Sequence, residues 1–286
     1  MNTRLEENNT KISLKLKIFY AVIILICIIA IIVAVYVQIK SDKKETTGAG
    51  NTTTNQPATN MEANKKEFNN MFDNQVNYMN NNNYKITKIE QSKEIIYTGY
   101  QKKENVLNDY ELDINIPYIN IHNEKIEEYN KEIVETFEKK AKSILNIQNN
   151  SIIYTVNYSA YVTNNILSLV IRSTLKEGNN PQRDIVQTYN YDLTNQKEYT
   201  IQEVLEMRGI TKQQANQKIK EEIKQVQQNV SQMQNLGYKV YPRNAEDDMY
   251  NVNNVTEFFL GENNKLYIVF AYGNKNNTSE IDIIVM

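Results

Sequence analysis

Residues 151–175 read SIIYTVNYSAYVTNNILSLVIRSTL, and this stretch decides the fold. Apolar and polar residues alternate around Tyr158 in its first half and around Leu169 in its second half. Alternation with a period of two residues indicates strands that bury one face. Asn164-Asn165 between the halves is a tight-turn signal, because Asn tolerates positive φ. The stretch therefore predicts an antiparallel β-hairpin.

Further strands and helices are expected on both sides of this hairpin. Asn123 is a candidate N-cap, and capping boxes begin at Thr200 and Thr211. Helices are expected over residues 68–79, 123–145, 200–209 and 211–237, and strands over residues 95–121, 183–193, 258–260, 266–272 and 281–285. The predicted fold class is α+β, with an antiparallel β-sheet and helices packed on one of its faces.

The expected helix over residues 211–237 has a narrow apolar stripe. Ile219, Ile223, Val226 and Val230 recur at heptad-like spacing along it. Such a stripe is typical of a coiled coil, and it also suits a helix that packs on the sheet of its own domain. Packing on the domain's own sheet is the preferred interpretation, and oligomerisation through the helix is the alternative.

A second decisive feature is the run IFYAVIILICIIAIIVAVYV at residues 18–37, which contains no charged residue. About 20 apolar residues at 1.5 Å rise cross a hydrocarbon layer of about 30 Å. Tyr20 and Tyr36 lie near its ends, where aromatic rings favour the headgroup region. The run predicts one N-terminal transmembrane helix, so the lipid bilayer is the first expected partner.

The charges around this span favour an N-terminus inside the cell and a C-terminal domain outside it. Lys11, Lys15 and Lys17 precede the span, and the segment before it is short. The expected plan is a cytoplasmic tail over residues 1–17, the helix over 18–37, a disordered stalk over 38–64 and an extracytoplasmic domain over 65–286. The alternative is a cleaved signal peptide, although the apolar run is longer than a typical signal core.

Composition narrows the classes of function. Cys27 is the only cysteine and lies inside the span, so no internal disulfide is expected in the domain. The net charge of −2 argues against a nucleic-acid partner, because nucleic acid needs a basic surface. Residues 41–64 have almost no large apolar side chain, which is typical of a flexible linker.

No motif for catalysis or cofactor binding is present in the sequence. His122 is the only histidine, and its place at a strand-to-helix corner suits a capping role better than a catalytic one. Neither a P-loop nor a paired-histidine metal motif occurs. Carboxylate pairs such as Asp247-Asp248 leave a wall hydrolase as a lesser alternative. We expect a protein that is not an enzyme and that has no cofactor and no metal.

Two irregular segments are the candidate ligand-binding loops, because binding residues concentrate on loops held by a rigid sheet. The chain contains 20 Tyr and no Trp, and tyrosines on the strand near Tyr189 and Tyr191 could add to such a surface. Aromatic packing within the sheet is the alternative role for those two. The candidate contacts are Gly178, Asn179, Asn180, Pro181 and Arg183 in the first loop and Tyr238, Tyr241, Pro242 and Arg243 in the second.

The order of these elements resembles a known family. A strand ending in Ile116-Pro117, the segment ILSLVIRSTLKEG, the segment YNYDLTNQKEYTIQEVL and the closing LYIVFAYGNKNNTSEIDIIVM carry the resemblance over about residues 95–286. Together they are similar to the extracytoplasmic domain of RsiV-type anti-sigma factors, which sense lysozyme. The same type of domain precedes the catalytic part of some peptidoglycan deacetylases. Gly178–Arg183 stands where members often carry a Gly-Gly-Ala-His loop.

The resemblance implies a membrane-anchored binding or sensor domain of a bacterial cell envelope. Its ligand would be a lysozyme-like protein or a cell-wall component. With 17 residues before the span, no anti-sigma domain is expected, so a signal would need a membrane signalling partner. The alternative is an envelope assembly or scaffold protein that oligomerises through the helix over residues 211–237.

Overall fold

The predicted hairpin lies at the centre of a seven-stranded sheet. In the computed structural model, β4 (Ile152–Thr163) and β5 (Ile166–Glu177) pair antiparallel along their full length. Asn164 and Asn165 make the turn with φ of 52° and 64°. Both are residues that tolerate this left-handed region, which confirms the turn signal. The sequence around the hairpin therefore fixes both the strands and the turn between them.

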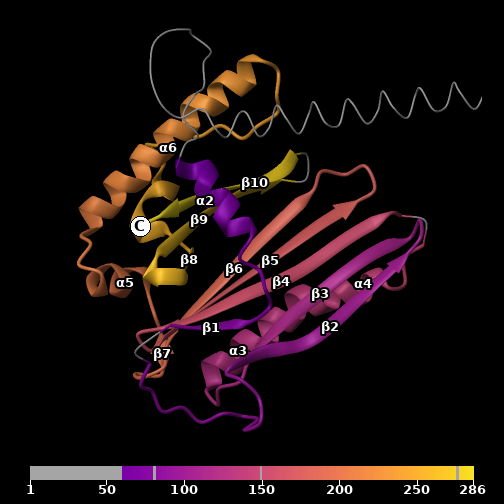
Figure 1. The fold of residues 1–286 in the computed structure, drawn as a ribbon. Helices are drawn as coiled ribbons and strands as arrows, with labels where there is room; N and C mark the ends of the chain where they lie inside the picture. The colour runs from indigo at the N-terminus through magenta and orange to yellow at the C-terminus, as the bar shows by residue number, and fades with distance from the viewer. Residues whose placement is uncertain (1–59, 80–81, 149, 275–276) are drawn as a thin grey trace, which may run out of the picture. The chain divides into compact units, whose positions relative to one another are not determined.

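The other strands of this sheet add on both sides of the hairpin (Figure 1). The order is β2-β3-β4-β5-β6-β7, and β1 pairs with β4 outside that path. The added strands are β1 (Val76–Tyr78), β2 (Ile96–Val106), β3 (Tyr110–Ile119), β6 (Arg183–Asp192) and β7 (Lys197–Glu198). This sheet is called the large sheet below.

The large sheet is mixed, which corrects the expectation of a purely antiparallel sheet. β3 and β1 both pair parallel with β4. β3 pairs with residues 152–156 in the first half of β4, and β1 pairs with residues 160–162 of β4. At the fork between them, the Asn157 side chain accepts hydrogen bonds from Asn74 and Asn115. The parallel pairing arises because the chain leaves β3, runs through a helix and returns to start β4 from the same end.

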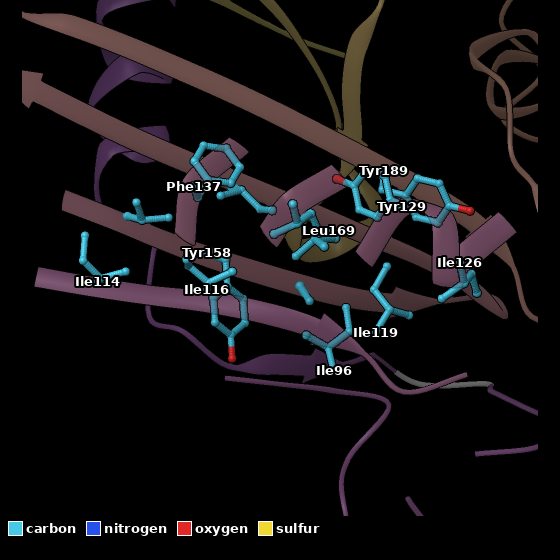
Figure 2. Close-up of a cluster of buried hydrophobic side chains, with 14 of the residues drawn as sticks. Ile96, Ile114, Ile116, Ile119, Ile126, Tyr129, Phe137, Tyr158, Leu169 and Tyr189 are labelled. Atoms are coloured by element: carbon cyan, nitrogen blue, oxygen red, sulfur yellow. The ribbon is translucent and has the colours of Figure 1, made fainter. Parts of the chain in front are cut away.

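That crossover helix covers one face of the large sheet. It consists of α3 (Glu124–Ile133), a π-helical turn η1 (Val134–Glu138) and α4 (Lys139–Ile144). The Asn123 side chain accepts from the Lys125 N–H and caps its start, as expected. Figure 2 shows Ile126, Tyr129 and Phe137 of this helix packing over strand residues such as Leu169 and Tyr189. Its apolar stripe is thus buried in the main core.

A second, three-stranded antiparallel sheet packs on the opposite face of the large sheet. It contains β8 (Glu257–Leu260), β9 (Leu266–Asn274) and β10 (Asn277–Val285) in the order β10-β9-β8. Tyr161 and Val170 of the large sheet contact Phe259, Val269 and Ile283 of this small sheet. The expected strands exist, but they form two stacked sheets instead of one.

The remaining helices cover the outer face of the small sheet. α5 (Ile201–Met207) and α6 (Lys212–Asn235) start with the capping boxes of Thr200 and Thr211. Ala215, Ile219 and Ile223 of α6 are buried in one cluster with β8, β9 and β10. The preferred interpretation, packing of the long helix on its own domain, is confirmed. Helices therefore cover the outer faces of two sheets and not one face of a single sheet.

Three 3-10 helices complete the elements. They lie in the connections before β8 and before β9, and they are η2 (Asp248–Tyr250), η3 (Val252–Asn254) and η4 (Glu262–Asn264).

The N-terminal part of the folded region differs from the prediction. A helix α2 occupies Asn60–Asn69, and residues 76–78 form a strand where helical spacing had suggested a helix. Met61 and Phe68 of α2 are 3% and 1% exposed, so the folded region begins inside the expected stalk. Residues 76–78 pair with the free part of β4, and this pairing overrides their helical spacing.

The structure describes residues 60–79, 82–148, 150–274 and 277–286. The expected tail, the expected span over residues 18–37 and most of the expected stalk lie outside these ranges. Within them, no helix combines the length and the apolar character that crossing a membrane requires. All the described residues belong to one compact unit, Pro57–Met286.

Candidate functional site

A groove of about 610 Å³ opens along the outer edge of β6 and is called the β6-edge groove. One wall comes from η1 and α4 and the other from the β9–β10 hairpin, with β4, β5 and β6 between them. The lining residues are Thr136, Lys140, Tyr154, Ser173, Leu175, Glu177, Arg183, Asp184, Ile185, Ala271, Tyr272, Gly273 and Ser279. The groove thus gathers residues from seven elements at one strand edge.

Small residues on the hairpin wall explain why this space is empty. Away from the β9–β10 turn, the side chains of Tyr267, Val269 and Ile283 fill the space between the small sheet and the large sheet. Toward the β9–β10 turn the same face of the hairpin carries Ala271, Gly273 and Ser279, which are too small to continue this packing.

The bottom of the groove is apolar on the side of the crossover helix. Tyr154, Leu175 and Arg183 lie in one row across β4, β5 and β6. Ile185, in the next row, is 49% exposed. Burial raises the pKa of Tyr154, and the hydrogen bond with the Ser173 side chain only partly opposes the rise. The Tyr154 phenol is therefore neutral and offers an apolar surface with one polar end.

The two carboxylates of the groove are already engaged within the protein. Glu177 Oε1 lies 2.8 Å from Lys140 Nζ. Asp184 accepts a hydrogen bond of 2.7 Å from Thr174 Oγ1 and lies 3.3 Å from Arg172 Nη2. Glu177 lies on the face of the large sheet toward the crossover helix and Asp184 on the face toward the small sheet, so these two do not face each other as the paired carboxylates of a glycosidase do.

Among the described charged residues that line the groove, Arg183 alone has no such partner. No described residue forms an ion pair or a side-chain hydrogen bond with its guanidinium. A partly buried guanidinium gains from a planar anionic group, because its N–H donors match a carboxylate or phosphate. The local charge therefore favours a ligand with an acidic group.

The backbone of β6 is also open along the groove. Outside the ladder with β5, the Gln182 carbonyl accepts from the Ser279 N–H, and the Thr188 N–H donates to Glu257. Because backbone groups alternate in direction along an antiparallel strand, Asp184 and Val186 face the same way as Thr188. Among the described residues, none pairs with these outward groups of Asp184 and Val186.

The first predicted loop lies at one end of the groove. Gly178, Asn179 and Asn180 form an exposed turn between β5 and β6, and Gly178 has φ of +51°. Pro181 follows it and is half-buried. Of the five predicted residues in this loop, Arg183 alone lines the groove.

The second predicted loop lies behind the hairpin wall. Arg243 is 4% exposed, and its guanidinium binds both oxygens of Asp282, at 2.8 and 3.2 Å. It also forms an ion pair with Glu280 and stacks over the Tyr272 ring, 3.9 Å from the centroid. Although burial opposes it, the bonded Asp282 raises the pKa of Arg243 above its usual value. These contacts leave no part of the guanidinium free for a ligand.

The other residues of this loop have mixed surroundings. The Tyr241 N–H donates to Glu280, and the Tyr241 ring stacks with Tyr272 at a centroid distance of 6.3 Å. Tyr238 is 61% exposed, and Pro242 is also exposed. The two predicted loops meet through β10, since Ser279 bonds the first and Glu280 the second. The second loop supports the wall that the first loop borders.

The remaining candidates have structural roles. Tyr189 and Tyr191 are buried, and Tyr189 stacks with Tyr129 at 4.1 Å, so these rings are core residues. His122 is exposed and bonds Glu127, and Asp247 caps the short helix η2. In the ranges that the structure describes, no group of three His, Cys, Asp or Glu side chains could hold a metal ion.

Sequence reasoning missed most of the groove. Lys140, Ile185 and Ser279 come from a helix, a strand and a hairpin that are distant in the chain. One signal was available: Ala271 and Gly273 interrupt an otherwise bulky strand, and small residues there mark space or close approach. The partner strand across that space could not be read from the sequence.

No family model matches the chain, and no curated protein does. One similar solved structure is a DUF3298 family protein from Pseudomonas aeruginosa PAO1, with a TM-score of 0.33 and 9% sequence identity. The match covers 71% of this chain and 91% of that chain. At this TM-score the two folds are only loosely alike, and nothing about function follows from the match.

Proposed function

We propose that this chain is a membrane-anchored binding or sensor protein without enzymatic activity, which takes its ligand in the β6-edge groove. The observation that carries the proposal is Arg183, whose guanidinium has no partner among the described residues, beside the strand edge at Asp184 and Val186, whose outward backbone groups have none there either. A free cation and free backbone donors at one concave site are features of recognition. They supply no nucleophile or general base placed for reaction.

The anchor in this proposal is the apolar run over residues 18–37. Residues 1–17 would face the cytoplasm, and the folded domain from Asn60 onward would lie outside the membrane. The linker between span and domain is then about 22 residues, which corresponds to roughly 26 Å root-mean-square as a random coil. The ligand would therefore be one that is present near the outer surface of the cell membrane.

The resemblance to RsiV-type domains suggests a lysozyme-like protein or a cell-wall component as the ligand. A sensor of this kind would signal through another membrane protein. The scaffold alternative has less support, since the stripe of α6 that would form a coiled coil is buried against the small sheet.

The test measures binding by the full chain in detergent. Lysozyme and soluble cell-wall fragments are titrated by calorimetry against the protein and its Arg183→Ala variant. The control Lys131→Ala removes one positive charge from an exposed position of α3 outside the groove. A charge-assisted contact is worth about 1.5–3 kcal/mol, so we expect Arg183→Ala to weaken binding by roughly tenfold or more.

Two results would contradict the proposal. Equal loss of affinity in Arg183→Ala and Lys131→Ala would mean that general charge, and not the groove, attracts the ligand. Absence of binding to every probe and to a whole envelope extract, by protein shown to be folded, would remove the binding function itself.

A further inference from the structure

We infer that the ligand of the β6-edge groove is an extended polypeptide segment, which adds to the large sheet as a strand beside β6. This inference rests on the proposed function, because it specifies the ligand of the same groove. It follows from the backbone of β6, from the charge of Arg183 and from the shape of the two walls.

The unpaired part of the β6 edge lies between Gln182 and Thr188 and is called the window below. The chain itself satisfies the outward groups at Gln182, through Ser279, and at Thr188, through Glu257. Between these limits, the outward N–H and C=O groups of Asp184 and Val186 have no partner among the described residues. An unpaired strand edge is a template for another strand. The window is roughly 20 Å long at about 3.3 Å per residue, which suits a short segment.

The walls show why the groove can hold a strand at this edge. The groove touches both faces of β6, because its lining includes Ile185 toward the crossover helix and Asp184 toward the small sheet. An added strand places side chains on both faces alternately, so it needs space on both sides. On one side, the small residues Gly273 and Ser279 leave that space. On the other side, the groove itself separates β6 from Thr136 of η1.

Side chains beside the window predict which segments fit. Arg183 and Ile185 point to the same face, two residues apart. A neighbouring strand would therefore present an acidic side chain beside Arg183 and an apolar one, two residues away, beside the 49% exposed Ile185. The preferred partner is an extended protein segment in which an acidic and an apolar residue flank one intervening residue.

The experiment uses a random heptapeptide library selected on the full chain in detergent. Selected peptides are then measured against two variants at Val186. Val186→Pro removes the outward N–H and is a tolerated kind of change on an edge strand. Val186→Ala keeps the N–H and controls for the loss of the Val186 side chain. A second set of peptides carries one N-methyl group at each backbone position in turn.

The inference predicts three results. Selected peptides share the acidic and apolar pair at a spacing of two. Val186→Pro weakens their binding at least tenfold more than Val186→Ala does. N-methylation weakens binding at every second position only, because alternate amides of an added strand face β6. This last readout holds even if Val186→Pro is poorly folded.

Other results would overturn it. Peptides that bind but tolerate N-methylation everywhere would show recognition by side chains alone, and the proposed function would stand. Failure to select any peptide, while lysozyme or cell-wall fragments bind, would exclude a strand ligand and leave the groove as a binding site. Concentration-dependent dimers that Val186→Pro abolishes would identify a second copy as the occupant. If no probe binds at all, the proposed function fails together with the inference.

Discussion

At the scale of single residues, Arg183 and Arg243 show how similar sequence contexts lead to different roles. Both follow a proline within two residues, and both were expected in ligand-binding loops. Arg183 lies at an open strand edge, and no residue in the described ranges forms an ion pair with it. Arg243 is buried between two carboxylates of β10 and the ring of Tyr272. The difference depends on what the rest of the fold places beside each residue.

Arg243→Ala is expected to destabilise the protein strongly. The change leaves Asp282, which is 1% exposed, as a buried carboxylate without its bidentate partner. Breaking a buried ion pair from one side costs about 3–5 kcal/mol. The free energy of unfolding from urea titration measures the effect. The double variant Arg243→Met/Asp282→Leu removes both charges and should lose much less, and equal losses in the two variants would contradict this account.

Glu257 is expected to make stability fall as pH rises. Burial raises the pKa of Glu257 above 4.5, although hydrogen bonds from Thr188 oppose the rise. The folded protein then retains a proton that the unfolded chain has lost, so stability declines from about pH 4.5 up to the folded pKa. Glu257→Gln keeps an oxygen that can accept from Thr188 and does not titrate.

The variant should therefore gain stability over the wild type as pH rises from 4 to 7, measured by thermal unfolding. Glu128→Gln removes one charge from an exposed position and serves as the control. A constant difference between Glu257→Gln and the wild type across this range would show that burial of Glu257 is not the cause.

At the scale of elements, local signals predicted what local interactions determine. The turn at Asn164-Asn165, the N-cap at Asn123 and the capping boxes at Thr200 and Thr211 all appear as expected. The parallel pairing of β3 and β1 with β4 was not predictable in this way. It depends on where the crossover helix returns the chain, and that is a long-range property.

The helix α2 is the clearest element that sequence reasoning missed. Its residues NMEANKKEFN have low apolar content, so the segment resembles a linker. Two side chains fix it to the domain: Met61 packs with the cluster under α6, and Phe68 packs in one cluster with Tyr161 and Phe259. Glu67 adds bonds to Lys265 and Tyr267, and these bonds lower the pKa of Glu67.

Phe68→Ala is expected to lower the free energy of unfolding by about 3–5 kcal/mol, because it leaves a cavity between the two sheets. Phe68→Leu retains most of the apolar volume and should lose much less. Urea unfolding of the full chain in detergent gives both values. If Phe68→Ala costs under about 1 kcal/mol, α2 is not part of the stable domain, and the expected stalk would extend beyond it.

At the scale of the whole molecule, the fold class was predictable and the site was only partly so. Alternating strands and capped helices indicate an α+β domain without reference to any partner. The groove instead forms where a helix, a strand edge and a hairpin meet, and its lining extends from Thr136 to Ser279. Arg183 was found because it lies in a distinctive loop. Its groove neighbours come from ordinary element positions that carry no local signal.

The central claim is that the edge of β6 at Asp184 and Val186 is open in the free protein and is where a ligand binds. Residue-resolved amide hydrogen exchange of the full chain, free and with bound ligand, tests it most directly. We expect the Asp184 and Val186 amides of the free protein to exchange at least about tenfold faster than those of Ile185 and Gln187, which face β5. A bound ligand should slow both. Equal protection of all four amides in the free protein, or ligand protection confined to another surface, would contradict the claim.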